Sequence, residues 1–243
     1  MKKLWEDIGN NVEFLLVSAL VIAVLFGLAV LGEWWVKKRS GQGHKQVSPV
    51  KRMVICAMMG AIAGILMVFE FPIPFLAPSF YQLDFSELPA LIAAFAMGPV
   101  AGVAVEVVKV LLKLLIKGTS TAFVGDLANL VIGCSMVIPA SLIYQFRRTR
   151  KTAVVSLTVG TAVMTVFGSM FNAVYLLPTF AVMFQWPLDQ IIEMGAAVNP
   201  GIHSLTTFVM LAVAPVNLLK GTAVSVLTLL IYKKISVVLR LSR

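Results

Sequence analysis

The amino-acid sequence predicts an all-α polytopic membrane protein, with a six-helix core preceded by one extra N-terminal transmembrane helix. Of the 243 residues, 59% are hydrophobic and 13% are charged, whereas an average soluble domain has about 25% charged residues. Several runs of about 20 apolar residues are long enough to cross a bilayer as helices. We therefore divide the chain into residues 1–49, an N-terminal transmembrane helix with a basic linker, and residues 50–243, the core.

The basic residues are grouped at the ends of the apolar runs. Of the 20 lysines and arginines, six lie in 37–52, four in 147–151 and four after 232. Clusters of this kind are typical of cytoplasmic loops. We expect these loops and the C-terminus to be cytoplasmic and the N-terminus to lie outside. The same grouping argues against nucleic acid as a partner, despite the net charge of +9.

The first two apolar runs are predicted to be transmembrane helices. Residues 12–36 are longer than the apolar part of a signal peptide, about 7–15 residues, which favours a retained anchor. Residues 50–71 contain Ala57, Gly60, Ala61 and Gly64. Small residues at this spacing let another helix approach closely. The partner is either another helix of this chain or another subunit, and the sequence leaves both open.

A proline-containing loop, residues 72–86, leads into a short apolar segment, 86–98. About 11 helical residues are too few for a hydrocarbon core of about 30 Å. The segment either begins earlier in the loop or lies where the protein is locally thin. The predicted topology, with both ends of the six-helix core cytoplasmic, requires this segment to cross the membrane. The next helix, 99–116, is followed by Lys117 and carries Lys109 and Lys113 on the same face, which we expect to point inward. Glu106 and Lys109 are three residues apart on this helix, and this spacing predicts an ion pair between them.

Three further helices complete the predicted core. One begins at Gly125 and ends near residue 146, and another spans about 152–177 and stops before Pro178. A long segment with Trp186 follows. The last helix is predicted to begin at Pro215, because a proline in the first turn costs no helical hydrogen bond.

Polar residues from four places are predicted to meet at a similar depth. Asn217 and Lys220 share one face of the last helix, and Asn172 lies near the end of the helix before it. The remaining candidates are Tyr81, Leu83 and Asp84 and, less strongly, Asp126 and Asn129. A mostly apolar pocket with a few polar groups is typical of a small-molecule site. Asparagine and lysine together suit a flat ligand edge that alternates donors and acceptors, such as a pyrimidine-dione. The alternative is that these groups only join helices, with Lys220 paired to Asp84 or Glu106.

The sequence gives little support to catalysis or metal binding. We find no His-Glu metal cluster, no Ser/His arrangement, no paired carboxylates on one helix and no phosphate-binding Gly-rich loop. The two cysteines, Cys56 and Cys134, lie inside apolar runs without metal-ligand spacing. We therefore expect no catalytic residue, no metal and no cofactor. An intramembrane enzyme acting on lipid or a prenyl group stays the alternative from another functional class.

Five stretches together resemble one family. They are Leu83 to Leu91, Gly98 to Gly102, Glu106 to Lys109, Gly125 to Asn129 and Ala214 to Gly221. In these stretches the chain resembles the riboflavin-specific substrate-binding subunits (S components) of energy-coupling factor (ECF) vitamin transporters of bacterial cell membranes. The resemblance covers about 50–234, and it is specific only as a set.

The resemblance implies a six-helix S-component core that captures riboflavin at the outer face. It implies that Asn172, Asn217 and Lys220 bind the isoalloxazine ring, and that the loop with Tyr81, Leu83 and Asp84 covers the ligand. Ala57 and Ala61 match the family's docking motif for the transmembrane coupling subunit. Two cytoplasmic ATPases complete such a transporter, so its ATP is used by partners.

The chain also departs from the family in two places. The helix at 12–36 is additional, and Asp126 stands where we expect glutamate. A subunit for another vitamin on the same fold stays an alternative, because a fold alone does not fix its ligand.

Overall fold

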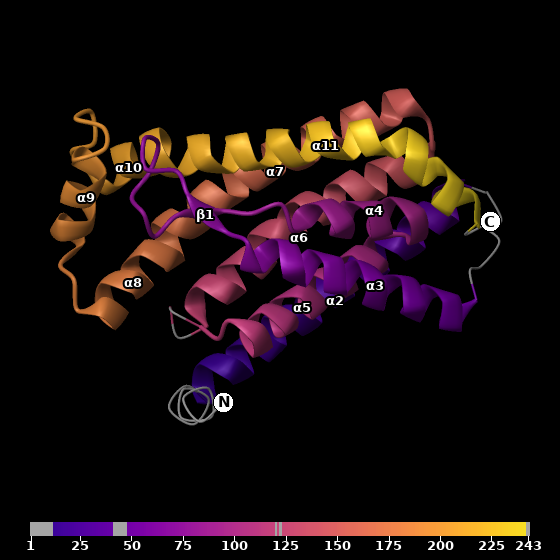
Figure 1. The fold of residues 1–243 in the computed structure, drawn as a ribbon, viewed down its shortest axis with the longest axis horizontal. Helices are drawn as coiled ribbons and strands as arrows, with labels where there is room; N and C mark the ends of the chain where they lie inside the picture. The colour runs from indigo at the N-terminus through magenta and orange to yellow at the C-terminus, as the bar shows by residue number, and fades with distance from the viewer. Residues whose placement is uncertain (1–11, 41–47, 120, 122, 242–243) are drawn as a thin grey trace.

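The computed structural model is a bundle of long helices that lie roughly side by side (Figure 1). The structure describes residues 12–40, 48–119, 121 and 123–241. In chain order the elements are α2 (Val12–Ser40), α3 (Pro49–Val68), β1 (Phe71–Pro72), β2 (Gln82–Leu83), α4 (Glu87–Met97), α5 (Pro99–Ile116), α6 (Val124–Phe146), α7 (Arg150–Phe171), η1 (Asn172–Leu176), α8 (Leu177–Phe184), α9 (Leu188–Ala196), α10 (Leu205–Phe208), η2 (Val209–Val213) and α11 (Ala214–Leu241). The predicted all-α polytopic class is confirmed.

Five helices in the described part of the chain are long and apolar enough to cross a membrane. They span Leu16–Arg39, Pro49–Val68, Val124–Phe146, Arg150–Phe184 and Leu205–Ile231. The end of α2, the start of α3 and the C-terminal end of α11 lie together at the right of Figure 1, and α8, α9 and α10 lie at the opposite end. The predicted basic ends of these helices therefore gather on one side of the bundle. Much of the basic linker, 41–47, and the N-terminal residues 1–11 fall outside the described residues.

The extra helix α2 packs against α5 and α6. Ala29 is fully buried in this contact, and a methyl group at Gly32 would lie 2.7 Å from Leu142 Cδ2. Near the end of α2, the Glu33 carboxylate pairs with Arg52 of α3 at 3.3 Å. The rest of α2 is largely exposed, as expected for a helix that faces lipid on its outer side.

The short helix α4 lies inside the bundle, and the chain before it completes the crossing. All but two of its residues are buried, so that α4 has little contact with the surroundings. Asp84 and Ser86, which precede α4, are also buried, and Asp84 contacts Lys220. Because Lys220 lies near the middle of the span Leu205–Ile231, the non-helical chain at Asp84 reaches the same depth. Such backbone is tolerated in a membrane where protein surrounds it.

The predicted helix boundaries at Pro178 and Pro215 are wrong. The helix expected to stop at 177 continues through η1 and α8 to Phe184, and the helix expected to begin at Pro215 is continuous from Leu205. A proline inside a helix clashes with the carbonyl four residues earlier and lacks its own donor.

A wide π-helical turn precedes each of these two prolines. The amide of Leu177 donates to the Asn172 carbonyl, and the amide of Ala214 donates to the Val209 carbonyl, five residues back in both cases. This change of register lets each helix pass its proline without ending. As a consequence, Asn217 and Lys220 lie near the middle of their span and not in its outer third, as the predicted start at Pro215 implied.

Candidate functional site

A cavity of about 350 Å³ lies between the loop after α3 and helices α6, α7, α9 and α11. Its volume is in the range of small-molecule sites. It is lined by the predicted residues Tyr81, Asp126, Asn129, Asn172, Asn217 and Lys220, together with apolar side chains such as Met67, Ile132, Met164, Phe180 and Trp186. The structure therefore brings six of the eight predicted binding residues to one cavity.

The other two predicted residues, Leu83 and Asp84, lie beside the cavity and not in its lining. Leu83 is buried in β2, where it pairs with Phe71 of β1. Asp84 accepts hydrogen bonds from Lys220 Nζ at 2.9 Å and from Asn129 Nδ2 at 3.1 Å. Asp84 thus holds two lining residues in place from behind.

Asn172 is fixed by hydrogen bonds on both sides of its carboxamide. The Tyr81 hydroxyl donates to Asn172 Oδ1 at 2.7 Å, and Asn172 Nδ2 donates to the carbonyl of Gly168 at 2.7 Å. Asn172 is the first residue of η1, and the wide turn therefore begins at a cavity-lining side chain.

Asn217 and Lys220 come from α11, three residues apart. The Nδ2 atom of Asn217 is buried and has no hydrogen-bond partner among the described residues. An unpaired buried donor costs about 1–3 kcal/mol, and a ligand acceptor would remove this cost. Lys220 is buried but fully engaged, with ion pairs to Asp84 at 2.9 Å and to Glu87 at 2.8 Å.

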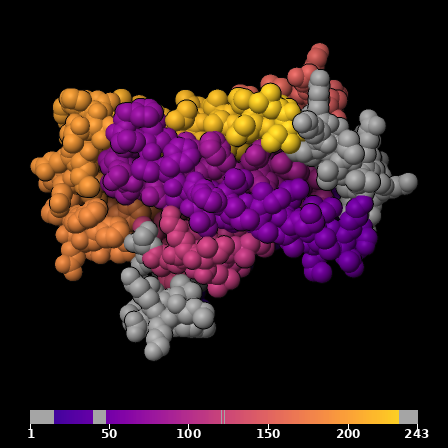
Figure 2. Space-filling model, in the orientation of Figure 1, coloured from indigo at the N-terminus to yellow at the C-terminus, as the bar shows by residue number. Residues whose placement is uncertain are grey.

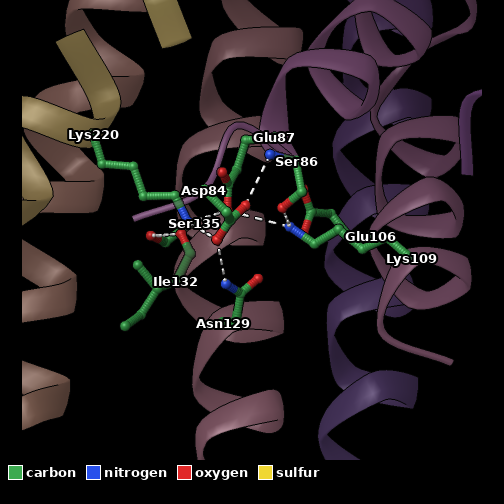
Figure 3. Close-up of polar contacts among 9 residues, drawn as sticks. All are labelled: Asp84, Ser86, Glu87, Glu106, Lys109, Asn129, Ile132, Ser135 and Lys220. Carbon is green, nitrogen blue, oxygen red and sulfur yellow. Dashed lines mark hydrogen bonds and ion pairs between the residues drawn. The ribbon is translucent and has the colours of Figure 1, made fainter. Parts of the chain in front are cut away.

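Lys220 is part of a buried ionic cluster, which we define as Asp84, Glu87, Glu106, Lys109 and Lys220 (Figure 3). Lys109 Nζ lies 2.7 Å from Glu106 Oε2 and 3.2 Å from Glu87 Oε1. It also donates to the Ser86 hydroxyl at 2.8 Å. Burying an isolated charge is costly, and close opposite charges offset that cost. The cluster ties the loop, α4, α5 and α11 together beneath the cavity.

The expected pairings are only partly found in this cluster. The predicted pair of Glu106 with Lys109 on one helix face is confirmed. Of the two partners considered for Lys220, Asp84 is confirmed, whereas Glu106 pairs with Lys109 instead. The second partner of Lys220 is Glu87 of α4, which was not among the partners considered.

The start of α6 supplies a second polar part of the cavity wall. Asp126 Oδ1 lies 2.6 Å from Lys113 Nζ, and Asn129 is one turn further along the same face. Asp126 Oδ2 and Asn129 Oδ1 are buried acceptors without a hydrogen-bond partner in the described part of the chain. These acceptors contrast with the donors Asn217 Nδ2 and Lys220 Nζ on α11. The cavity wall therefore carries donors on one helix and acceptors on another.

An aromatic group closes the end of the cavity formed by α8 and α9. Phe184 and Trp186 stack at a centroid distance of 4.9 Å, and Phe180 packs edge-on against Phe80 of the loop at 6.2 Å. All four residues line the cavity. The segment with Trp186 thus lines the same cavity as the polar groups.

The small residues of α3 belong to two different faces of the helix. A methyl group at Gly60 would lie 2.4 Å from Val108 Cγ1, and one at Gly64 would lie 2.9 Å from Leu112 Cβ, so these glycines face α5. Ala57 and Ala61 are instead exposed. Figure 2 shows that α3 and the loop after it form much of the face turned to the viewer. We call the exposed residues Val54, Ala57, Met58, Ala61, Ile62 and Ile65 the outer face of α3.

Nothing in the described residues suggests a metal centre. No group of three or more His, Cys, Asp or Glu side chains is arranged there to hold an ion. Cys56 and Cys134 are both free thiols, and His203 is exposed on the segment before α10. His44 falls outside the described residues. The polar cavity is therefore the candidate site of this chain.

Comparison with known proteins agrees with this arrangement. The sequence model of the family described as "ECF transporter, substrate-specific component" matches residues 51–232. The riboflavin transporter FmnP of Bacillus subtilis (strain 168) is 34% identical over 189 residues, covering 76% of this chain and 92% of that protein. The riboflavin transporter RibU of Staphylococcus aureus (strain TCH60) is 35% identical over 197 residues, covering 81% and 96%.

A solved structure, described as the S component of a bacterial ECF transporter, has the same fold. Its TM-score is 0.60 at 33% identity, and the match covers 78% of this chain and 97% of that one. The family match begins after α2, which is therefore an addition to the shared core. Since this match extends over most of the sequence, the chain belongs to the substrate-specific components of ECF transporters.

Proposed function

We propose that this chain binds riboflavin and delivers it to an ECF-type, ATP-driven uptake transporter. The observation that carries the proposal is the cavity with Asn172, Asn217 and Lys220 in its wall, in a chain whose relatives are named riboflavin transporters. The orphaned Asn217 donor and the Lys220 ammonium suit the carbonyl and ring-nitrogen acceptors of a pyrimidine-dione. Tyr81, Phe180 and Trp186 supply apolar area for a flat ring system.

The ribityl chain of riboflavin fits the other polar part of the wall. Its hydroxyl groups are donors, and Asp126 Oδ2 and Asn129 Oδ1 are buried acceptors that lack partners in the described residues. We assign the ring edge to Asn172 and to Asn217 and Lys220 of α11, and the hydroxylated chain to the start of α6. Asp126, at a position where we expected glutamate, keeps the negative charge and contacts Lys113 at 2.6 Å.

The cavity end of the bundle is proposed to face the outside of a bacterial cell. Support comes from the basic residues near the ends of α2 and α6 and the starts of α3 and α7, because such clusters remain cytoplasmic. This orientation puts the loop with Tyr81 and the segment with Trp186 on the side where substrate arrives. The N-terminus would then also lie outside, and the C-terminus inside.

The chain itself is proposed to be non-catalytic. Its sequence has no phosphate-binding Gly-rich loop, so ATP would be hydrolysed by two cytoplasmic partner subunits. The transmembrane coupling subunit would dock on the outer face of α3, where Ala57 and Ala61 leave room for a close helix. Riboflavin is the cargo in this scheme, and the chain needs no cofactor.

The binding proposal is tested with the purified full-length chain. It should carry a yellow ligand or quench riboflavin fluorescence on titration, in detergent and in nanodiscs. Asn217→Ala and Lys220→Ala should each weaken binding by about 1–3 kcal/mol, the cost of an unpaired polar partner. If the well-folded chain does not bind riboflavin but binds another vitamin, the proposed substrate is wrong and the family assignment still holds.

The docking proposal is tested by separating binding from uptake. Ala57→Trp should leave riboflavin affinity unchanged and block uptake by cells that contain the whole transporter, because the indole fills the contact. Leu111→Trp is the matched control, since Leu111 is also exposed but belongs to α5 and not to the outer face of α3. If Ala57→Trp abolishes binding itself, Ala57 belongs to internal packing.

A further inference from the structure

Gly168 of α7 lies between the two asparagines of the cavity. Its carbonyl oxygen accepts the hydrogen bond from Asn172 Nδ2 at 2.7 Å. On its other side, the carboxamide of Asn217 packs directly against the glycine. A methyl group at position 168 would lie 2.8 Å from Asn217 Nδ2 and 3.3 Å from Asn217 Cγ. One backbone position therefore contacts both side chains that we assign to the ring edge.

Glycine suits position 168 because there is no room for a side chain, and not because of the backbone conformation. Gly168 lies within the regular part of α7, where alanine would be favoured by about 1 kcal/mol. The space for a methyl group is closed from two helices, because Ile132 of α6 would also lie 3.3 Å away. Interiors at this packing density do not absorb an extra carbon without a shift. The Asn217 carboxamide, at 2.8 Å, would have to move first.

We propose that Gly168 is a positioning residue for ring recognition, holding the carboxamides of Asn172 and Asn217 in the orientation that meets the ligand. The inference rests on the proposed function, in which these two side chains bind the ring. Gly168 itself needs no contact with the ligand. Its carbonyl oxygen accepts the hydrogen bond from Asn172, and its lack of a side chain leaves space for the Asn217 carboxamide.

The contact between α7 and α11 contains a second glycine that serves as a matched control. A methyl group at Gly221 would lie 2.9 Å from Thr161 Cγ2, nearly as close as the approach at Gly168. Close to this point, the hydroxyls of Thr161 and Ser225 lie 3.0 Å apart. Gly221→Ala therefore disturbs the spacing of the same two helices without a methyl group against either asparagine.

The experiment measures riboflavin affinity and thermal unfolding for Gly168→Ala, Gly221→Ala and the unchanged protein. Gly168→Ala should weaken riboflavin binding at least about tenfold, because the Asn217 donor is displaced. The unfolding temperature should fall by a similar amount in both variants, because the two methyl groups meet neighbouring atoms at 2.8 Å and 2.9 Å. Gly221→Ala should nevertheless leave the riboflavin affinity nearly unchanged. Equal losses of affinity in both variants would mean that helix spacing alone matters, and would overturn the inference.

A double-mutant cycle with Asn217→Ala identifies the route of the effect. If Gly168 acts through Asn217, Gly168→Ala should add little further loss of affinity in the Asn217→Ala background, where the methyl group has room. This background also keeps the test valid if Gly168→Ala alone does not fold. Lumiflavin, which has the isoalloxazine ring system with a methyl group in place of the ribityl chain, should lose affinity by the same factor as riboflavin. Additive losses, or an effect on riboflavin but not on lumiflavin, would overturn the inference, whereas an unchanged protein that binds no flavin would overturn the proposed function.

Discussion

Three lysines on one face of α5 and its C-terminal end form ion pairs at three different depths. Lys109 is 0% exposed and lies between Glu106 and Glu87. Lys113, one turn further, is 7% exposed and pairs with Asp126 in the cavity wall at 2.6 Å. The third, Lys117, is 44% exposed and pairs with Glu70 at the same distance, 2.6 Å.

The length of an ion pair does not determine its contribution to stability. The two outer pairs are as short as the pairs of Lys109, so distance alone would rank them together. An ion pair in water contributes about 0–1 kcal/mol, because solvent and salt screen it. Removing one member of a buried pair leaves a charge without compensation and costs about 3–5 kcal/mol. We therefore expect three replacements of the same kind to have very different effects.

The largest effect is expected for Lys109→Met. Methionine fills a similar volume but leaves Glu106 without a positive partner and Glu87 with only Lys220. Stability should fall by about 3–5 kcal/mol, measured as a lower unfolding temperature and less folded protein in the membrane. Lys109→Met combined with Glu106→Gln should recover part of the loss, because the unpaired carboxylate is removed as well. If Lys109→Met is as stable as the unchanged protein, burial does not raise the cost of losing this ion pair.

An intermediate effect is expected for Lys113→Met. Asp126 would lose its partner, but both residues line the cavity and do not lie in the packed interior that surrounds Lys109. We expect a stability loss of about 1–3 kcal/mol, measured by thermal unfolding without riboflavin. Lys113→Met with Asp126→Asn should restore stability. A loss as large as that of Lys109→Met would mean that the cavity wall behaves as dry interior.

Much of this arrangement could be predicted from the sequence, because it depends on residue type and helical spacing. Lysines repeated every fourth residue must share one face of a helix, and the structure confirms the inward orientation of Lys109 and Lys113. Asn172, Asn217 and Lys220 stood out as polar residues within apolar runs, where a polar group needs a partner or a cavity. These arguments require no knowledge of how distant segments pack.

The predicted helix boundaries are wrong because they rest on a local rule for proline, whereas the surrounding structure decides whether a helix continues. Proline at the first turn of a helix is common, and Pro178 and Pro215 each follow an apolar run that suggested a boundary. The structure instead accommodates both prolines through the π-turns η1 and η2. A five-residue turn has no distinct composition, so the sequence could not reveal it.

Two important residues were missed for a related reason. Glu87 follows Ser86 and precedes Pro89, which is the usual composition of a helix start, and its pairing with Lys220 depends on a loop that enters the bundle. Gly168 is one of 17 glycines. Only the approach of Asn217 from α11 distinguishes it from the others.

The smallest effect is expected for Lys117→Met at the exposed end of the series. Its pair with Glu70 is short, yet solvent reaches the lysine, so that stability should change by less than about 1 kcal/mol. The measurement is thermal unfolding at low and high salt. The small contribution of Lys117 should disappear at high salt, whereas the deficit of Lys109→Met should persist, because buried pairs are screened much less. A loss of several kcal/mol in Lys117→Met would mean that the loop around Glu70 shields this pair from solvent, and depth along α5 would then no longer predict the cost of losing an ion pair.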